Sequence, residues 1–395
     1  MPLTKPMHRW FAHGSYLHAL RLLLAPQRLR ESLHTDHPPS LRNSAVAGTQ
    51  VAIAAFVVAA ALHFSPWSHV LGFASMGALA ALFGRAASVP QRRRIVPLAG
   101  LLLVGPVTLL SWLSWHGLEP WALLLALAIL SGLLASIAHR LQLGAPGAVI
   151  FIFAASTALQ PLDSLTLLWQ RSAAMALGVA AAVLLCRLTD HLRVVATTPQ
   201  PAMLPSQKPS PTPSPGYAAR QSLRVAFCAA VSAGIAHAAG WSHPAWAAIG
   251  AVAVLQGAHL PGTVHRAWQR TLGTVVGAAI AWALLTASPS LWTLLLAVAV
   301  LQISTEMSMG VNYALGQVFV TPMALLMTAL AMPGEATDMA ISRIFDTALG
   351  AGVGTVLAWA FSTLDERVYL ARHHRQQKKS PLLPSNTEAR KKNFL

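Results

Sequence analysis

Charged residues are scarce in this chain of 395 residues. Asp, Glu, Lys and Arg make up 10% of it and apolar residues 55%, whereas about a quarter of the residues in soluble domains are charged. The stretches 43–84, 95–118 and 225–265 contain no charged residue. Since a helix needs about 20 apolar residues to cross a bilayer, the composition excludes an ordinary water-soluble protein and indicates an integral membrane protein.

Cysteine is also rare. Cys186 and Cys228 both lie inside apolar runs, which excludes a disulfide framework and a cysteine-based metal site. The 16 histidines are scattered, and the sequence has no paired-histidine metalloprotease motif, no nucleophile turn and no phosphate-binding glycine loop. We therefore expect no enzyme activity, no metal and no cofactor. No cleavable signal peptide precedes the first apolar block, so the first span is expected to remain in the protein.

Breaks at Pro, Gly, Trp and charged residues divide the apolar sequence into twelve predicted spans. The expected fold class is therefore all-α, a polytopic membrane protein. The predicted spans are 44–64, 69–84, 95–115, 121–138, 146–161, 168–187, 223–240, 245–260, 271–287, 291–306, 312–331 and 340–362.

Lys and Arg indicate the orientation of these spans, because they stay on the cytoplasmic side of short loops. If both termini are cytoplasmic, Arg171 and Arg343 are the only Lys or Arg residues outside the cytoplasmic segments. The outer loops then contain acidic residues and tryptophan but no Lys or Arg. Topology then explains the net charge of +16, and we expect no nucleic-acid binding. The sequence predicts a multi-pass membrane protein, surrounded by lipid.

Two parts of the sequence resemble each other at an offset that falls only from 182 to 171 residues. Each part has six predicted helices, so both begin on the cytoplasmic side and are expected to form parallel repeats about an axis normal to the membrane. A solute path is then expected between the halves. The matched pairs are Arg42 with Arg224, Pro66 with Pro244, Arg94 with Arg270, Trp121 with Trp292, and Arg171 with Arg343.

The chain divides into five segments on this interpretation. The first is expected to form an amphipathic helix on the inner leaflet, the Pro/Ser-rich linker to be a cytoplasmic tether, and the basic tail to be attracted to anionic lipid. The segments are the N-terminal segment 1–40, the first repeat 41–193, the linker 194–219, the second repeat 220–365 and the tail 366–395.

Specific motifs follow one another in the second half. Together with Glu306, they resemble the core pattern of the fusaric acid resistance protein family, a group of bacterial inner-membrane exporters. The first half resembles the family only in outline. The motifs are HPAWAA at 243–248, VLQ at 254–256, RAWQRTLGTVVG at 266–277, NYA at 312–314, TP at 321–322 and RIFDTALG at 343–350.

The resemblance implies efflux of aromatic or other organic acids, driven by the proton gradient, and a more distant similarity to plant malate-permeable anion channels. The longer exporters carry a large cytoplasmic domain where this chain has only its Pro/Ser-rich linker. We therefore expect an exporter of small, aromatic carboxylates. A passive organic-anion channel and an envelope scaffold that moves no solute are the alternatives. The sequence leaves open whether the protein works with a periplasmic efflux partner and whether it forms a homo-oligomer.

Ionisable residues inside the predicted spans are the first candidates for the transport path, because charge in a bilayer is costly. Arg343 and Asp346 lie about one turn into the last span, and Arg171 has the equivalent place in the first half. We expect the two arginines to flank the path and bind a carboxylate bidentately, and Asp346 and Glu306 to take up protons. Alternatively, Arg343 and Asp346 neutralise each other, Arg171 reaches the outer surface, and Glu306 pairs with a loop arginine.

Polar and small residues of the second half complete the set of candidates. Asn312, Tyr313 and Thr321 can hydrogen-bond to substrate or, alternatively, to neighbouring helices. Small residues four positions apart favour close helix packing, with a mobile surface for alternating access as the second interpretation. The predicted packing residues are Gly273, Gly277, Gly350 and Gly354.

Overall fold

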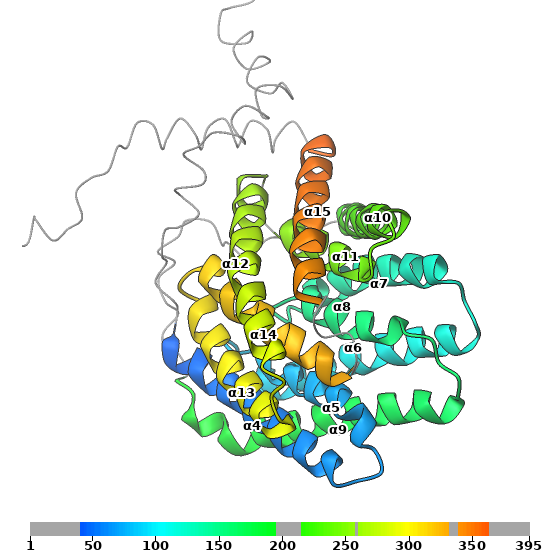
Figure 1. Ribbon diagram of the computed structural model, residues 1–395. Coiled ribbons are helices and arrows are strands. Elements are labelled where there is room, and N and C mark those ends of the chain that lie inside the picture. Colours follow the sequence, from blue (N-terminus) through cyan, green and yellow to red (C-terminus); the bar gives the residue numbers. More distant parts are fainter. Residues whose placement is uncertain (1–39, 195–214, 257–259, 332–338, 363–395) are drawn as a thin grey trace, which may run out of the picture.

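The part of the chain that the computed structural model describes is helical and contains no strand, which confirms the all-α class. The helices pack into one bundle (Figure 1). The described residues are 40–194, 215–256, 260–331 and 339–362.

Three of the predicted segments lie almost entirely outside the described residues. They are the amphipathic N-terminal segment of 1–40, the Pro/Ser-rich linker of 194–219 and the basic tail of 366–395. The predictions for these segments stay predictions.

Helices occur at the position of every predicted span. In the first half they are α4 (Leu41–His63), α5 (Leu71–Gly77), α6 (Val89–Trp115), α7 (Pro120–Arg140), α8 (Ala148–Ser156) and α9 (Leu165–Thr189), with short 3-10 turns η1 (Ser68–Val70), η2 (Ala78–Leu82), η3 (Thr157–Leu159) and η4 (Asp190–Leu192). In the second half they are α10 (Pro215–Ala238), α11 (Pro244–Leu255), α12 (Leu260–Thr286), α13 (Leu291–Met309), α14 (Tyr313–Ala331) and α15 (Met339–Ala360).

Local sequence signals set where several of these helices begin. The Ser40 hydroxyl accepts a hydrogen bond from the Asn43 amide at 3.2 Å and caps α4. A proline occupies the first position of α7 (Pro120) and of α11 (Pro244), where its missing N–H costs no helical hydrogen bond. The turn between α10 and α11 contains Gly240 at a φ of 73°, a conformation that glycine adopts readily.

Seven described helices are long and apolar enough to cross a membrane: α4, α6, α7, α9 with η4, α13, α14 and α15. Many of their large apolar side chains are exposed, for example Leu101 on α6 and Leu296 on α13. Such side chains are compatible with lipid rather than water. The protein is thus a multi-pass membrane protein.

Three other predicted spans are shorter than we expected. The apolar helical segments 68–82, 148–159 and 244–255 replace the predicted spans 69–84, 146–161 and 245–260. A helix of 12 residues such as α11 is about 18 Å long, well below the roughly 30 Å of a hydrocarbon core.

These short segments form the centre of the bundle. All residues of α5 and η2 are buried, as is α11 from Ala245 to Val254. Backbone that is not helical is tolerated at membrane depth only where protein surrounds it. The longer helices enclose the short ones and supply that protein environment, which explains why the short helices need not span the bilayer.

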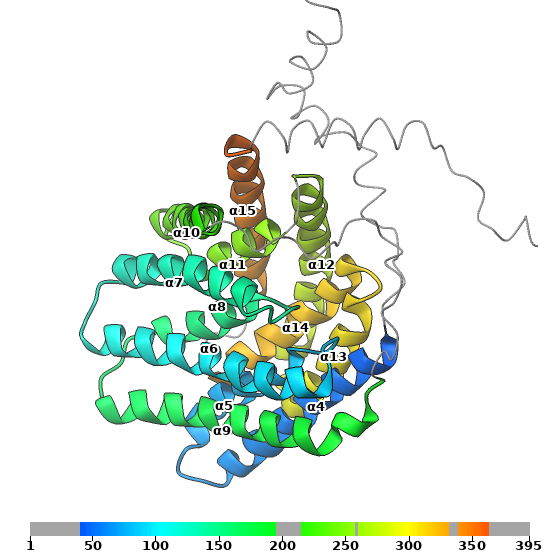
Figure 2. The same cartoon turned by 180° about the vertical axis from the view of Figure 1, so that it is seen from behind.

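The helix contacts inside the two halves follow the same order. In the first half, α4 packs on α5, α5 on α9, α6 on α8 and α9, and α7 on α8. In the second half, α10 packs on α11, α11 on α15, α12 on α14 and α15, and α13 on α14. Figure 2 shows α6, α7 and α9 of the first half as a layer of nearly parallel helices.

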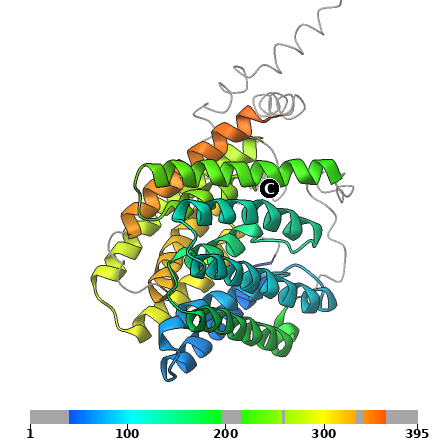
Figure 3. The ribbon, with the colours of Figure 1, turned by 90° about the vertical axis from the view of Figure 1, so that its right-hand side faces the viewer.

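The contacts between the halves come in reciprocal pairs. Helix α4 packs on α13 and α7 on α10, while α5 packs on α14 and α8 on α11. Figure 3 shows α10 lying along α7. Each of these four contacts therefore has a counterpart with the roles exchanged, whereas the smaller contact of α7 with α11 has none of comparable extent.

Candidate functional site

Arg343 lies in the second turn of α15 and is buried, with 3% of its surface exposed. Its guanidinium carbon lies over the ring of Trp246 on α11, 5.1 Å from the ring centre, which is a cation–π geometry. Its Nε has no hydrogen-bond partner among the described residues. A buried guanidinium with an unused donor is suited to bind an anion.

Asp346 lies on the same face of α15 and is fully buried. Neither of its carboxyl oxygens has a hydrogen-bond partner within the described part of the chain, and no ion pair joins it to Arg343 there. Thr347 also has a buried hydroxyl without a partner in that part. Arg343 and Asp346 therefore attract each other electrostatically without a direct ion pair or hydrogen bond in the described residues.

Arg171 has the same arrangement in the first half. It lies on α9, partly buried, with its guanidinium carbon 5.3 Å from the ring centre of Phe73 on α5. Its Nη1 is buried without a hydrogen-bond partner in the described residues. Both arginines thus turn inward onto a short central helix, so the contacts do not favour the alternative in which Arg171 reaches the outer surface.

The structure does not bring Arg171 and Arg343 together. Each lies over an aromatic ring of its own half, and no contact between them is present in the described residues. The charged neighbours that act on Arg343 are Arg270 of α12 and Asp346. The two arginines therefore form two separate places for an anion.

Glycines bring the same helices close together beside each arginine. A Cβ atom on Gly178 of α9 would overlap the carbonyl oxygen of Ala74 on α5, and one on Gly350 of α15 would overlap that of Ala247 on α11. Helix backbones can approach this closely only where the side chain is absent. Sequence reasoning missed Phe73, Trp246 and Gly178, because nothing in the spacing along the chain links them to the arginines.

The predicted packing glycines lie at helix contacts. A Cβ atom on Gly273 would lie 2.5 Å from the Ala314 carbonyl oxygen of α14, and one on Gly277 would lie 2.8 Å from the Thr321 Cβ atom. A Cβ atom on Gly354 would lie 3.2 Å from Ala251 of α11, next to the contact of Gly350.

The three predicted polar residues all contact protein groups. The Asn312 Oδ1 accepts hydrogen bonds from the Ala314 and Leu315 amides and so caps α14. The Tyr313 hydroxyl accepts a hydrogen bond from Arg270 Nη1 at 3.3 Å. The Thr321 hydroxyl is 3.5 Å from that of Thr274 on α12. These contacts favour the alternative of hydrogen bonding within and between helices.

Glu306 forms an ion pair with Arg85. Its Oε2 lies 2.7 Å from Arg85 Nη1, and only 7% of the Glu306 side chain is exposed. Arg85 lies in the loop between η2 and α6, as in the alternative that Glu306 pairs with a loop arginine. Because Glu306 belongs to α13, this ion pair joins the two halves.

A second buried charge network lies at the end of the first half and was missed by sequence reasoning. Arg92 of α6 donates to Asp190 Oδ1 at 3.1 Å, to Gln50 Oε1 at 2.6 Å and to the Ala81 carbonyl oxygen at 2.8 Å. Arg193 Nη2 donates to three carbonyl oxygens of the loop 84–87. The sequence places Arg92 in a triple arginine, which we interpreted only as a topology signal.

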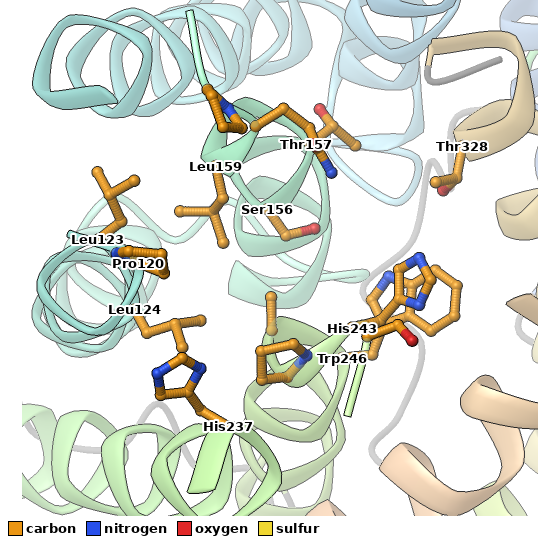
Figure 4. Close-up of a pocket in the computed structure, with 15 residues that line it drawn as sticks. Pro120, Leu123, Leu124, Ser156, Thr157, Leu159, His237, His243, Trp246 and Thr328 are labelled. Carbon is orange, nitrogen blue, oxygen red and sulfur yellow. The ribbon is translucent and has the colours of Figure 1, made fainter. Parts of the chain in front are cut away.

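A cavity of about 220 Å³ lies where α7, η3, α10, α11 and α14 meet (Figure 4). On one side, the His243 ring stacks on Trp246, 4.3 Å between centres and 14° from parallel, and Leu123 and Leu124 form the opposite side. Its lining residues are Pro120, Leu123, Leu124, Ser156, Thr157, Leu159, Gln160, Pro161, His237, Ser242, His243, Pro244, Ala245, Trp246 and Thr328.

The described residues contain no group of three or more His, Cys, Asp or Glu that could hold a metal ion. Both cysteines are buried and unpaired. The expectation that the protein is not an enzyme stays a prediction.

Comparisons with known proteins show a similarity in the second half of the chain. A family model described as fusaric acid resistance protein-like matches residues 229–357. The uncharacterized membrane protein YvaC of Bacillus subtilis (strain 168) is 36% identical over 129 residues, which are 31% of this chain and 20% of the relative. The match thus spans about a fifth of that relative's length. No solved structure matches the chain. The family match confirms the predicted resemblance over residues 229–357.

Proposed function

We propose that this protein exports small organic carboxylates, aromatic ones in particular, across the bacterial inner membrane in exchange for protons. Both termini face the cytoplasm in this proposal, and the path runs between two parallel six-helix repeats. The match of residues 229–357 to the fusaric acid resistance protein-like family and the multi-pass helical architecture support a transport role.

The helix contacts support the repeat. Most contact pairs within the first half have a counterpart in the second, and the main contacts between the halves are reciprocal, as expected for a twofold axis along the membrane normal. The contacts of Arg171 with Phe73 and of Arg343 with Trp246 follow the same correspondence, since 343 exceeds 171 by 172 and 246 exceeds 73 by 173.

The observation that carries the proposal is this pair of inward-facing arginines, each stacked on an aromatic ring with a buried nitrogen that has no partner in the described residues. A guanidinium that is not neutralised offers a carboxylate charge-assisted hydrogen bonds. The low dielectric of the surroundings strengthens that attraction. We infer two carboxylate sites, one in each half, rather than one clamp made by both arginines.

Asp346 is the group that we assign to proton coupling. It lies one helical turn from Arg343, and its carboxyl oxygens have no partner within the described residues. Because Asp346 lies one helical turn from Arg343, its protonation state changes the electrostatic field at the carboxylate site, and this change is what would link proton movement to transport. Glu306 is a weaker candidate, because Arg85 already neutralises it.

Transport into inverted membrane vesicles tests the proposal. Labelled benzoate should accumulate several-fold more when the vesicle lumen is acidic than when the two sides have equal pH. Arg343→Ala and Arg171→Ala should each reduce the initial uptake rate about tenfold or more, equivalent to roughly 1.4 kcal/mol. Arg343→Lys should recover only part of it, because lysine lacks the planar fork of arginine.

Arg140→Ala provides the matched control, because Arg140 is exposed at the end of α7. Normal uptake in both arginine variants at normal protein level would contradict the carboxylate sites. Equal benzoate uptake with and without the pH gradient would indicate a passive channel instead. If the wild-type protein transports none of a broad panel of carboxylates, the transport role itself is wrong and the scaffold alternative is favoured.

A further inference from the structure

The cavity of Figure 4 contains chemistry that the arginine sites do not use. Its position at the start of α7 and α11 corresponds to the side that the charge pattern assigns to the outside. It includes both Thr157 and Thr328, which are separated by 171 residues, the offset between the matched tryptophans Trp121 and Trp292. The cavity therefore lies between the two halves.

The size of the cavity limits its ligand. A cavity of about 150 Å³ accommodates benzene, so about 220 Å³ has room for a single ring with a small substituent. Leu123, Leu124 and Leu159 form apolar walls, and Trp246 presents an aromatic ring. Flat apolar surfaces of this kind favour an aromatic ring over a sugar or another strongly hydrated solute.

The polar groups of the lining favour an acid. The Gln160 amide and the imidazole of His237 can donate hydrogen bonds to a ligand. The hydroxyl groups of Ser156, Thr157 and Thr328 donate to carbonyl oxygens within the chain. The lining contains no Asp or Glu to repel an anion. Trp246 has a second contact outside the lining, the guanidinium of Arg343, whose positive charge attracts an anion towards this ring.

We propose that this cavity is a binding site for a single-ring aromatic acid, separate from the two arginine sites and adjacent to the Arg343 site through Trp246. The ring lies against Trp246 and the leucine wall, and the carboxylate accepts hydrogen bonds from the Gln160 amide and the His237 imidazole. Its use as the exit of the path rests on the proposed export, whereas the binding itself does not.

Thiol labelling at Ser242 reports binding at this site. Ser242 is an exposed residue of the lining, and Ser242→Cys is made in a protein whose buried Cys186 and Cys228 are replaced by alanine. Benzoate should slow the reaction of this thiol with a membrane-impermeant reagent several-fold in the purified full chain. Benzyl alcohol, which has the ring without the carboxylate, should protect less. His116→Cys, at an exposed position after α6, should react at the same rate with and without benzoate.

Filling the cavity provides the second measurement. Ser242→Phe introduces the residue found at the matching position of the first half, where Phe64 precedes Pro66 as Ser242 precedes Pro244. Ser156→Met likewise introduces the residue of position 327. Both variants should weaken benzoate binding at this cavity about tenfold, while binding at the arginine sites stays as in the wild type. Phe64→Ser, in the other half, should bind as the wild type does.

Equal labelling rates with and without benzoate, or unchanged binding in both filled variants, would overturn this site. Benzoate binding that survives Arg343→Ala and is lost in Ser242→Phe would support the cavity even if vesicle transport fails. Conversely, normal transport in a protein whose Ser242→Cys thiol is not protected by benzoate would contradict the binding site in the cavity but not the proposed export.

Discussion

Arg92 shows what a buried charge contributes where no transport role is needed. It is 1% exposed and makes hydrogen bonds that join α4, η2, α6 and η4, including its ion pair with Asp190. A buried charge that loses its partner is costly, because its desolvation is no longer compensated. We interpret this network as one that stabilises the end of the first half that the charge pattern assigns to the cytoplasm.

Replacing Arg92 by methionine should therefore destabilise the protein. The substitution leaves the Asp190 carboxylate with the more distant Arg93 and Arg193 and removes hydrogen bonds to Gln50 and Ala81. We expect a loss of about 3 kcal/mol or more, seen as a lower thermal unfolding midpoint in detergent. Arg94→Met, at an exposed position of the same helix, should change the midpoint little. Equal thermal unfolding midpoints in the two variants would show that the Arg92 network does not stabilise the protein.

Arg343 differs from Arg92 in its partners rather than in its burial. Arg92 is surrounded by acceptors, whereas Arg343 has an aromatic ring and retains a nitrogen without a described partner. The sequence predicted that Arg343 lies inside a span, because the charge interrupts an apolar run. It did not predict the ring beneath the guanidinium, because Trp246 lies 97 residues earlier in the chain.

At the scale of elements, the closest contact of the second half is the crossing of α11 and α15. Gly350 faces the Ala247 carbonyl oxygen there, and a Cβ atom on Gly250 would lie 3.4 Å from the Thr347 carbonyl oxygen across the same contact. The crossing of α5 and α9 repeats it with Gly178 and Ala74. These crossings hold each arginine-bearing helix against the helix that carries its aromatic ring.

Gly350→Ala should consequently separate α15 from α11. The added methyl group overlaps backbone, which cannot rotate away, and overpacking of this kind costs about 1–3 kcal/mol. Gly352→Ala is the matched control, because a Cβ atom at Gly352 meets nothing within 4 Å and alanine favours a helix by about 1 kcal/mol over glycine. Thermal unfolding in detergent should place Gly350→Ala below the wild type and Gly352→Ala at or above it. The reverse order would contradict the packing role of Gly350.

The pairing of Gly350 with Gly354 was visible in the sequence, because both glycines lie on one helix four residues apart. The contact of Gly178 with Ala74 was not visible, because its two sides come from helices that are far apart along the chain. Spacing along one helix predicts a packing surface, but it does not identify the partner helix.

For the whole molecule, the ion pair of Arg85 with Glu306 is the described salt bridge that joins the two halves. It lies near the end that the charge pattern assigns to the cytoplasm. Alternating access requires the halves to separate at one end while they stay closed at the other. An ion pair across that boundary holds the cytoplasmic end closed in the proposed transport cycle.

Glu306→Gln should loosen this closure. We expect passive efflux of labelled benzoate from proteoliposomes, measured without a pH gradient, to rise several-fold over the wild type. The exchanged variant Arg85→Glu with Glu306→Arg should restore low efflux, because it re-forms the pair with the charges reversed. Arg140→Gln should leave efflux unchanged. If Glu306→Gln leaks no more than the wild type, the ion pair does not close the path.

The sequence by itself determined that this protein lies in a membrane and how many helical segments it has. The lack of charge from 43 to 84 and from 225 to 265 excluded a water-soluble fold, and Pro, Gly and charged breaks located every helix that the structure describes. These properties are local, because each helix satisfies its own backbone hydrogen bonds. They can therefore be inferred from a stretch of about 20 residues.

Only the tertiary structure decided which helices are central and what each charged side chain contacts. The segments 68–82 and 244–255 are as apolar as full spans, yet they are short and enclosed by other helices. Glu306 pairs with Arg85 across 221 positions, and Arg343 lies over Trp246. Burial and pairing depend on which distant segments meet, and hydrophobicity and spacing along the chain contain no information about that.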